Sequence, residues 1–558
     1  MHRFGNMLPG RFQFVLGVLA TAALLALVTP TATAAAATVT RVMIDSGRLV
    51  GATSPHATEI AVFKGIPFAA PPVGELRWRP PQNVEAWSGV RSAQASGSPC
   101  WQPLVPETSL YSRGPMSVSE DCLYLNVWSG GAAGAAKLPV MVWYHGGSNT
   151  TGHGSSLIFD GANLARKGAV VVTVNYRMGP FGFFAHPELT AESAHHSSGN
   201  YALLDQIAAL RWVQRNISAF GGDPARVMIF GQSAGALDVC LLMVSPLARD
   251  LLHGVIAHSG GCLRIEQLLE SSVAGTGAHA AGLAIASELS TDPGVPASIA
   301  ALRGIGPAEF VEGASRVGVP LARPIVDGWV IPRPPRELFM NGDYNHVPII
   351  VGAMADEFRG LAADAPELSQ AQYREQVQNT FPEHTDAIVA AYRTLSERST
   401  REALWKLSTH SFFAWESRSW ASIVSAAGGS AFVYHFSQPT AVFSLYIPER
   451  PEFPDPNGPR GLGAYHSGDL AYHFNNVGLV GLNWTPWDYE LADTISSYWV
   501  NFARTGNPNG TGLPPWPAYA RDADVVQEFG AEEAQVTSIE HPQHELLNVF
   551  DTAYDFMQ

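Results

Sequence analysis

Apolar runs alternate with amphipathic stretches along most of the chain. Residues 138–145 and 168–176 are continuous apolar runs rich in β-branched residues, which are typical of strands buried on both faces. Residues 201–215 instead carry apolar side chains at helical spacing. A third strand is predicted at 226–230, and the run 234–244 that follows it predicts a helix. Strands and helices therefore alternate in the first half of the chain.

The second half of the chain continues this alternation. Strands are predicted at 347–352 and 431–436, whereas 266–312 and 363–422 have mostly helical patterns. Strands that alternate with helices form a largely parallel sheet covered on both faces. We therefore expect an α/β fold with a large, mostly parallel central sheet and helices on both faces. The two long helical segments are expected to be insertions over the end of the sheet where ligands of open α/β folds bind.

The N-terminal segment has the three parts of a secretory signal peptide. Arg3 and Arg11 precede an apolar run over 14–28, and small residues follow at 32–37. The alternative is a membrane anchor, but the run is shorter than the roughly 20 residues that a spanning helix needs. We expect residues 1–34 to be removed, with cleavage near Ala34 or Ala36, and residues 35–558 to form one domain. The mature protein would be secreted, or periplasmic, without a stable membrane anchor.

Composition and charge narrow the class of protein. The chain has 558 residues, of which 46% are hydrophobic and 15% charged, and this is a globular composition. Its formal net charge is −15. Nucleic-acid binding depends on clustered Lys and Arg, so no nucleic-acid partner is expected.

The four cysteines, Cys100, Cys122, Cys240 and Cys262, are expected to form disulfides. Their number is even, and an exported protein meets an oxidising environment. Four cysteines allow three pairings, of which Cys100–Cys122 with Cys240–Cys262 is the one local in sequence. Neither the CxxC nor the HxxxH spacing of zinc sites occurs, so no metal site is predicted.

Residues 231–235, Gly-Gln-Ser-Ala-Gly, indicate a nucleophilic serine at Ser233. Such a motif also arises by chance in glycine-rich chains, where it would be only a structural turn. Here a predicted strand precedes it and a predicted helix follows, which is the setting of a nucleophile elbow. The turn needs small flanking residues because larger side chains would collide with neighbouring backbone. The N-terminus of the helix would point toward the reacting carbonyl.

A serine nucleophile needs a base, and the base needs an acid to orient it. In folds with such an elbow the chain order is serine, acid, histidine. Residues 354–357, Met-Ala-Asp-Glu, leave the end of a predicted strand, and His466 lies in the glycine-rich segment 463–469. On spacing alone, other histidines compete with His466.

Residues 143–148, Trp-Tyr-His-Gly-Gly-Ser, follow a predicted strand and are similar to a loop that stabilises oxyanions. Glycines at Gly146 and Gly147 would let backbone N–H groups approach a developing negative charge closely. The alternative is an ordinary β-turn.

Seven segments in a fixed order connect these residues with a known family. They are 63–77 (FKGIPFAAPPVGELR), 119–126 (SEDCLYLN), 175–180 (NYRMGP), 220–224 (FGGDP), 231–235 (GQSAG), 258–260 (HSG) and 498–506 (YWVNFARTG). Together they resemble the signatures of the type-B carboxylesterase/lipase family, the cholinesterase-like branch of the α/β-hydrolases. The resemblance covers nearly the whole mature chain and implies a single α/β-hydrolase domain over 35–558 that cleaves carboxylic esters without a cofactor.

The resemblance also implies roles for individual residues. Ser233 would be the nucleophile, His466 the general base and Glu357, second in the Asp-Glu pair, the acid; Asp356 remains the alternative acid because Phe358 stands where the family has glycine. The remaining implied features are the oxyanion donors Gly147, Ser148 and Ala234, the disulfide Cys100–Cys122, and a hydrogen bond from Ser259 to the acid.

Two departures separate this chain from cholinesterases, which hold a quaternary ammonium on a tryptophan in the first disulfide loop. Here the only tryptophan of that loop, Trp101, lies beside Cys100, and the residue before the nucleophile is the neutral Gln232. The sequence therefore favours a general carboxylesterase that acts on small esters as a monomer or small homo-oligomer. The alternatives are an interfacial lipase and a non-catalytic adhesion protein of the same fold.

Overall fold

The computed structural model describes residues 40–554, except 131–136, 273–274, 321, 448–452, 454, 456 and 531–535. The expected signal peptide, residues 1–34, lies outside the described residues. Within the described part of the chain, no helix is long and apolar enough to cross a bilayer.

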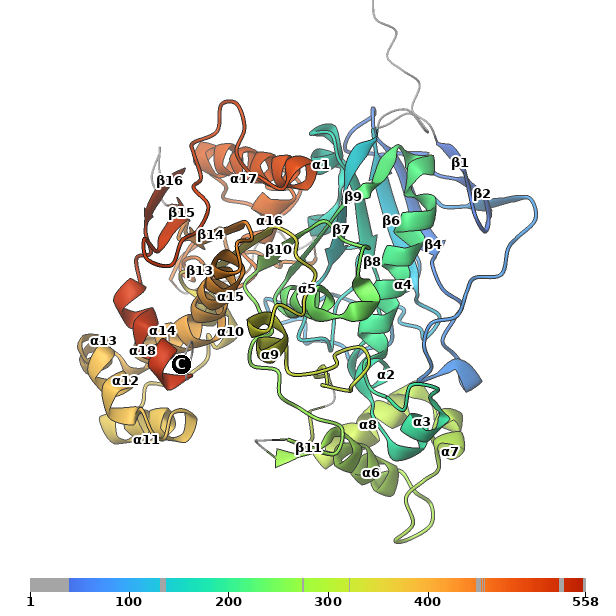
Figure 1. The fold of residues 1–558 in the computed structure, drawn as a ribbon, viewed down its shortest axis with the longest axis horizontal. Helices are drawn as coiled ribbons and strands as arrows, with labels where there is room; N and C mark the ends of the chain where they lie inside the picture. Colours follow the sequence, from blue (N-terminus) through green and yellow to red (C-terminus); the bar gives the residue numbers. More distant parts are fainter. Residues whose placement is uncertain are drawn as a thin grey trace, which may run out of the picture. The chain divides into compact units, whose positions relative to one another are not determined.

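An 11-stranded sheet forms the centre of the fold, with the order β16-β15-β14-β13-β10-β9-β7-β8-β6-β4-β3 (Figure 1). The strands from β8 through β15 in this order are parallel, while β3, β4, β6 and β16 pair antiparallel at the two edges. The mostly parallel sheet predicted from the sequence is thus confirmed. Its strands are β3 (Ala52–Thr53), β4 (Ala61–Pro67), β6 (Tyr124–Ser129), β7 (Leu138–Tyr144), β8 (Val170–Val174), β9 (Gly222–Gln232), β10 (Gly254–His258), β13 (Ile349–Met354), β14 (Ala431–Phe436), β15 (Val525–Phe529) and β16 (Val536–Glu540).

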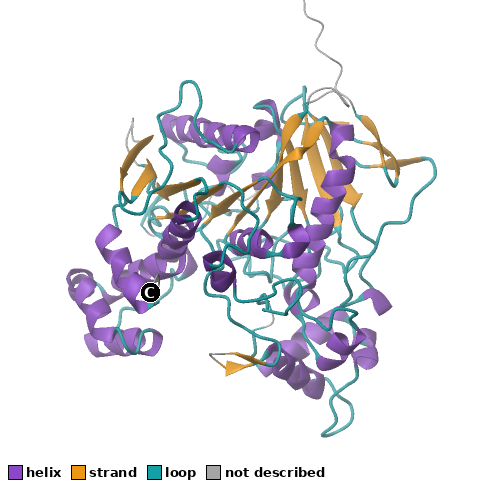
Figure 2. Ribbon diagram, in the orientation of Figure 1, coloured by secondary structure: helices purple, strands orange, loops and turns teal. Residues whose placement is uncertain are grey.

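Alternate side chains of each central strand enter two different cores. In β7, Val140 and Val142 belong to one buried cluster, whereas Met141 and Trp143 belong to the other. This follows from the two-residue period of a strand, and it explains why the central strands read as continuous apolar runs. Helices lie on both sides of the strands (Figure 2).

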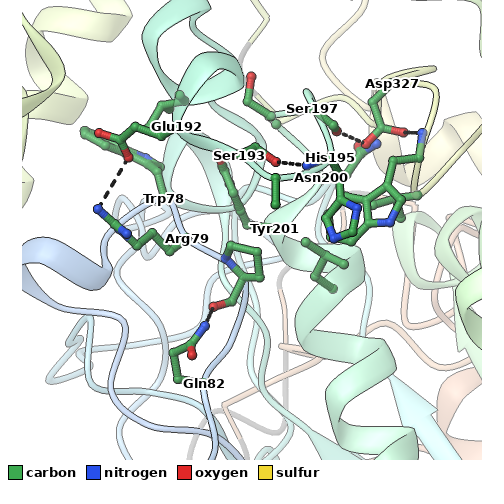
Figure 3. A pocket seen from close by; sticks show the side chains of 18 residues that line it. Trp78, Arg79, Gln82, Glu192, Ser193, His195, Ser197, Asn200, Tyr201 and Asp327 are labelled. Carbon is green, nitrogen blue, oxygen red and sulfur yellow. Dashed lines mark hydrogen bonds and ion pairs between the residues drawn. The ribbon is translucent and has the colours of Figure 1, made fainter.

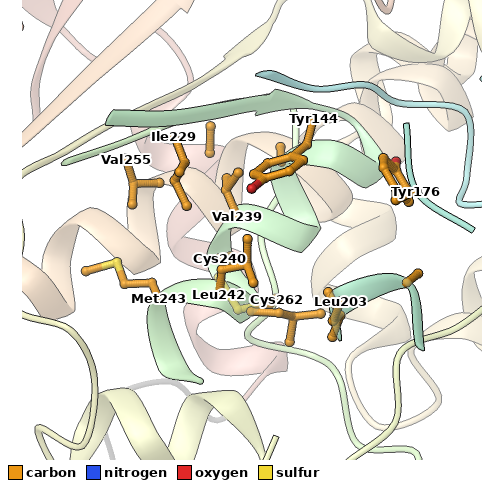
Figure 4. Packing of buried hydrophobic residues seen from close by; sticks show 14 of the residues in the cluster. Tyr144, Tyr176, Leu203, Ile229, Val239, Cys240, Leu242, Met243, Val255 and Cys262 are labelled. Atoms are coloured by element: carbon orange, nitrogen blue, oxygen red, sulfur yellow. A yellow bond between two sulfur atoms is a disulfide. The ribbon is translucent and has the colours of Figure 1, made fainter. Parts of the chain in front are cut away.

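The first core lies between the sheet and helices α4 (Tyr201–Asn216), α5 (Ala234–Val244) and α15 (Trp415–Ala426) (Figure 4). The second core joins the opposite face to α1 (Ala162–Arg166), α16 (Leu470–His473) and α17 (Pro486–Thr505). The sequence-based expectation of helices on both faces is therefore correct.

Helix α17 shows how local sequence sets the limits of an element. The Thr485 side chain accepts a hydrogen bond from the Asp488 N–H, and the Asp488 carboxylate accepts one from the Thr485 N–H at 2.6 Å, which forms a capping box. Pro486 occupies the first turn, where its missing N–H is not needed. The helix ends at Thr505 and is capped by Gly506, whose φ of 75° favours glycine.

Two groups of helices lie apart from each other beside the sheet, at the lower left and lower right of Figure 1. They correspond to the two helical segments expected as insertions. The group at the lower right contains α6 (Ala278–Glu288), α7 (Ile299–Gly304) and α8 (Pro307–Val317). The group at the lower left contains α11 (Gln370–Thr380), α12 (Thr385–Ala391), α13 (Arg393–Arg398) and α14 (Thr400–Thr409), and a π-helical turn, His410–Ala414, joins α14 to α15.

Shorter elements complete the described fold. They are the helices α2 (Gly179–Phe183), α3 (Pro187–Glu192), α9 (Pro335–Met340), α10 (Glu357–Leu361) and α18 (His544–Ala553), the 3₁₀ turns Gly74–Leu76, Leu157–Phe159, Ile217–Phe220 and Pro246–Ala248, and the small sheets β1 (Arg41–Ile44) with β2 (Gly47–Val50) and β5 (Val90–Ser92), and β11 (Ser271–Ser272) with β12 (Gly275–Thr276).

Both predicted disulfides are present. Cys100 is bonded to Cys122, and Cys240 to Cys262, so the pairing local in sequence is confirmed. The second bridge ties α5, which follows the nucleophile motif, to the segment after β10 (Figure 4). It therefore fixes the helix on which the candidate site is built.

Candidate active site

Ser233 occupies a tight turn between a strand and a helix. Strand β9 ends at Gln232, α5 begins at Ala234, and Ser233 has φ 57° and ψ −121°. A serine with positive φ is strained, and such strain is found where function requires it. A Cβ at Gly235 would lie 2.1 Å from the Tyr144 carbonyl oxygen, and one at Gly231 2.3 Å from the Gly235 carbonyl oxygen. The two glycines of the motif are therefore required by backbone contact.

His466 and Glu357 are joined by a short hydrogen bond. His466 Nδ1 lies 2.6 Å from Glu357 Oε2, and both side chains are buried. The other carboxylate oxygen, Oε1, accepts a hydrogen bond from the Met354 N–H at 2.9 Å. A carboxylate held in this way keeps the proton of the imidazole on Nδ1 and leaves Nε2 free to accept one.

The second ring nitrogen of His466 lies near the turn at Ser233. His466 Nε2 lies 3.1 Å from the side-chain amide of Gln232, the residue before Ser233. Among the hydrogen bonds of the described residues, none joins Nε2 to Ser233 Oγ. In hydrolases without substrate such contacts are often long, and they shorten when the substrate binds.

Asp356, the alternative acid, points away from the imidazole. Its carboxylate contacts Lys406 Nζ at 3.0 Å and Arg359 Nε at 3.3 Å, and it accepts a hydrogen bond from the Ala464 N–H at 3.1 Å. The geometry therefore favours Glu357, the second residue of the Asp-Glu pair, as the partner of His466.

The expected hydrogen bond from Ser259 to the acid is not formed among the described residues. Ser259 Oγ is buried and has no hydrogen-bond partner there. Both oxygens of Glu357 are already engaged, by His466 and by the Met354 N–H, and Ser259 is held at φ 54°.

The predicted oxyanion loop lies against Ser233, the candidate nucleophile. A Cβ at Gly146 would be 3.0 Å from Ser233 Cβ, so only glycine permits this approach. Gly147 has φ 122° and Ser148 φ 55°, and the Thr150 N–H donates to the Gly147 carbonyl at 3.0 Å. The loop therefore turns sharply beside Ser233, and Ala234, the third expected donor, begins α5 on the other side.

Comparison with known proteins decides the family. The model of the carboxylesterase family matches residues 38–547. The chain belongs to the carboxylesterase family. It is a carboxylic ester hydrolase with the α/β-hydrolase fold, as the sequence predicted.

Individual relatives support the same assignment. A fumonisin B1 esterase of Sphingopyxis macrogoltabida is 34% identical over 512 residues, which are 88% of this chain and 87% of the relative. A cocaine esterase of Homo sapiens is 33% identical, over 84% of this chain and 83% of its own. A crystal structure of a carboxylesterase of Geobacillus stearothermophilus matches with a TM-score of 0.77 at 32% identity, and covers 91% of this chain and 99% of that chain.

The loop of this carboxylesterase is tied to α5 through Asp238. Asn149 Nδ2 donates to Asp238 Oδ1 at 3.0 Å, and Gln206 Nε2 donates to Oδ2 at 2.6 Å. Burial raises the pKa of the Asp238 carboxyl to about 7, and these two hydrogen bonds oppose the rise. Asn149 is itself buried, so the hydrogen bond from its side-chain amide to Asp238 is shielded from water and stabilises the loop.

Two aromatic rings flank His466. The phenol of Tyr111 donates to the His466 carbonyl oxygen at 3.1 Å, and the ring of Phe413 lies 5.1 Å from the imidazole. Neither residue could be predicted as a neighbour of His466, because both come from segments far from it in the chain.

Three buried side chains behind the site lie close enough to hold a metal ion. Ligand atoms of His258, Asp469 and His473 all lie within 4.8 Å of one another. However, His473 Nε2 is 2.8 Å from Asp469 Oδ2, its Nδ1 accepts from Trp499 Nε1 at 3.0 Å, and His258 Nδ1 is 3.0 Å from the Tyr434 hydroxyl. Both ring nitrogens of His473 are engaged, so a metal ion would have to displace one of its contacts, and the geometry favours a hydrogen-bonded network.

A cavity of 220 Å³ lies elsewhere, at the N-terminus of α4 (Figure 3). His195 stacks on Trp329 with ring centroids 3.9 Å apart, and Arg79 pairs with Glu192 at 3.5 Å. None of the expected catalytic residues lines this cavity. The exposed His195 thus contacts an aromatic ring.

Proposed function

We propose that this carboxylesterase cleaves its ester through an acyl-enzyme on Ser233, with His466 as general base and Glu357 as the acid of the triad. The observation that carries the proposal is the 2.6 Å contact between His466 Nδ1 and Glu357 Oε2, with Nε2 directed toward the Ser233 turn. In support of the proposal, His466 pairs with Glu357 although they are more than 100 residues apart in the chain, and its Nε2 contacts Gln232, the residue before Ser233.

In the proposed first half-reaction, His466 Nε2 takes the proton of Ser233 as Oγ attacks the ester carbonyl. Glu357 stabilises the imidazolium that forms. The imidazolium then protonates the leaving alcohol, and the acyl group remains on Ser233. In the second half-reaction His466 activates a water molecule, which releases the acid and restores Ser233.

The negatively charged oxygen of each tetrahedral intermediate would accept hydrogen bonds from the oxyanion loop. The proposed donors are the backbone N–H groups of Gly147, Ser148 and Ala234. Each such donor contributes about 3 kcal/mol to the stabilisation of the transition state. Ser148, like every residue except proline, has a backbone N–H, so all three donors are available.

We also propose that the protein is exported after removal of residues 1–34. The N-terminal pattern supports this, and so do two disulfides, which persist in oxidising compartments. The N-terminal sequence of the protein recovered from the medium or periplasm tests it: a start near Ala35 or Ala37 is expected, and an intact Met1 would contradict export by cleavage.

The triad is tested by replacing Ser233 with alanine. The Ser233→Ala variant should hydrolyse p-nitrophenyl esters of short to medium chains at least about 10⁴-fold more slowly in kcat, because the nucleophile is lost. Steady-state kinetics over a series of chain lengths provides the measurement and defines the preferred acyl length.

Ser259→Ala is the matched control. Like Ser233, Ser259 is a serine with positive φ near the site, and its buried Oγ has no hydrogen-bond partner among the described residues. This variant should keep kcat within a few-fold of the wild type. A Ser233→Ala enzyme with wild-type kcat would show that Ser233 is not the nucleophile.

A further inference from the structure

Gln232 places a neutral amide against the reacting nitrogen of the proposed base. Its Nε2 lies 3.1 Å from His466 Nε2, the nitrogen that would take the proton of Ser233. Among the hydrogen bonds of the described residues, none joins this nitrogen to a carboxylate or a hydroxyl. The base is therefore bound, before an ester enters, by an uncharged side chain that has no role in the proposed proton transfers.

The amide has to be the donor in this hydrogen bond. Glu357 Oε2 lies 2.6 Å from His466 Nδ1 and keeps the proton of the neutral imidazole on that nitrogen. Nε2 then has a lone pair and accepts, so the NH₂ group of Gln232 donates. When the imidazole gains a second proton, Nε2 becomes a donor too, and two N–H groups oppose each other. The hydrogen bond therefore favours the neutral imidazole over the imidazolium.

The Gln232 side chain is packed between the oxyanion loop and the imidazole. It is 1% exposed and ends strand β9, and the N–H of the next residue, Ser233, donates to the His258 carbonyl at 2.9 Å. A Cβ at Gly146 would lie 2.6 Å from the Gln232 carbonyl oxygen and 2.8 Å from its Oε1. The oxyanion loop thus approaches one side of this amide, while the other side contacts His466.

The ionisable groups that face the imidazole from other elements act away from Nε2. Glu357 contacts Nδ1, and the ring of Tyr111 lies 6.4 Å from that of His466. Burial raises the pKa of the Tyr111 phenol well above its usual value, so this group is neutral at neutral pH. On the segment of His466 itself, Asp469 contacts a second histidine at 2.8 Å, and from the π-helical turn Phe413 presents an uncharged ring.

We propose that Gln232 is a positioning residue of this carboxylesterase: its side-chain amide donates to His466 Nε2 in the free enzyme, holds the imidazole beside Ser233 and favours its neutral form. Only the neutral form can take a proton, so Gln232 keeps the base active at a lower pH than His466 and Glu357 alone would allow. This inference rests on the proposed acyl-enzyme mechanism and adds a control of its base.

The test follows kcat/KM for a p-nitrophenyl ester against pH in the wild type and in Gln232→Met, with the product read at its isosbestic wavelength. The acid limb of this profile reports the ionisation of the base in the free enzyme. Methionine is similar in size to glutamine but cannot donate. The acid limb of Gln232→Met should therefore lie about 0.5 to 1 pH unit above that of the wild type.

Gln232→Glu keeps the shape of the side chain and reverses its electrostatic effect. A carboxylate next to Nε2 favours the imidazolium, so the acid limb should lie about 1 to 3 pH units above that of the wild type, higher than in Gln232→Met. Circular dichroism shows whether each variant is folded. Gln232→Leu, which also lacks a donor, replaces Gln232→Met in the comparison if the methionine variant does not fold.

Gln102→Met is the matched control for the loss of a buried amide. Gln102 is 2% exposed, and its Nε2 donates to the carbonyl oxygens of Cys100 at 2.9 Å and Gly152 at 2.8 Å. Its printed partners are thus backbone groups. Gln102→Met should lower Tm, because these carbonyls lose their donor, but its acid limb should coincide with that of the wild type. A merely structural role of Gln232 would give the same result in both methionine variants.

The outcomes separate this inference from the proposed function. If the acid limb of Gln232→Met coincides with that of the wild type or lies at lower pH, or if Gln102→Met shifts it equally, the role of Gln232 is wrong, while an inactive Ser233→Ala still supports the triad. If Ser233→Ala keeps the wild-type kcat/KM across the profile, the proposed function itself fails.

Discussion

Glu357 and Asp356 are adjacent in the chain, but their carboxylates contact different groups. Glu357 turns inward to His466 and the Met354 N–H, while Asp356 pairs with Lys406 and Arg359. The family motif favours the second residue of the pair, and the contacts favour the same residue. The two carboxylates therefore provide a sharp comparison of a proposed catalytic acid with a neighbour of similar chemistry.

Glu357→Gln should lower kcat about 10³- to 10⁴-fold while the protein stays folded. The amide cannot accept the Nδ1 proton and stabilise the imidazolium as a carboxylate does, and it favours the wrong tautomer of His466. Steady-state kinetics on a p-nitrophenyl ester and a circular dichroism spectrum provide the measurement.

Asp356→Asn is the matched control for this change. It removes a carboxylate one residue away and should retain kcat within about tenfold, because it has no contact with the imidazole. If Asp356→Asn lost as much activity as Glu357→Gln, or if Glu357→Gln kept wild-type kcat, the assignment of the acid would be wrong.

At the scale of elements, helix α5 begins directly after Ser233 and also contains Asp238, whose carboxyl has a raised pKa. Asp238 lies on this helix and binds the side chains of Asn149 and Gln206, so it joins the oxyanion loop, α5 and α4. Because burial raises its pKa to about 7, the folded protein holds a proton that the unfolded chain, with an ordinary aspartate pKa near 3.8, releases.

The stability contributed by this proton is present in full below about pH 4 and is lost as the pH rises through about 7. Asp238→Asn cannot lose the proton, so its Tm should decline less than that of the wild type between pH 4.5 and 7.5. Thermal unfolding at intervals across this range gives the two profiles.

Asp364→Asn, a change of the same type at an exposed position, is the control and should keep the wild-type profile. Parallel profiles for Asp238→Asn and the wild type would show that Asp238 does not titrate with a raised pKa in the folded protein.

At the scale of the whole molecule, several central elements could be predicted from the sequence because they are continuous apolar runs or have apolar residues at helical spacing. The helix 201–215 and the strand 431–436 correspond to α4 and β14. Strand β10, only five residues long, and the π-helical turn His410–Ala414 were not predicted. Short segments carry too little periodicity, and a π turn has no sequence signal of its own.

Some features of the candidate site could likewise be predicted from the sequence, and others could not. Ser233 and the oxyanion loop could be predicted because a tight turn requires a particular local sequence. Contacts between distant segments, such as Gln232 with His466 or Arg113 with Gly146, could not, because they depend on the packing of the whole sheet. Strands β9, β10, β13 and β14 are neighbours in this sheet and parallel, so their carboxyl ends deliver residues from distant parts of the chain to one edge.

The most direct test of the central claim is to locate the covalent intermediate. The enzyme is treated with a p-nitrophenyl alkylphosphonate, which reacts with serine nucleophiles and leaves a stable adduct, and the adduct is mapped by mass spectrometry of proteolytic peptides. We predict one adduct per chain, on the peptide that contains Ser233, with complete loss of esterase activity. An adduct on another residue, or complete modification of Ser233 with activity retained, would contradict the account.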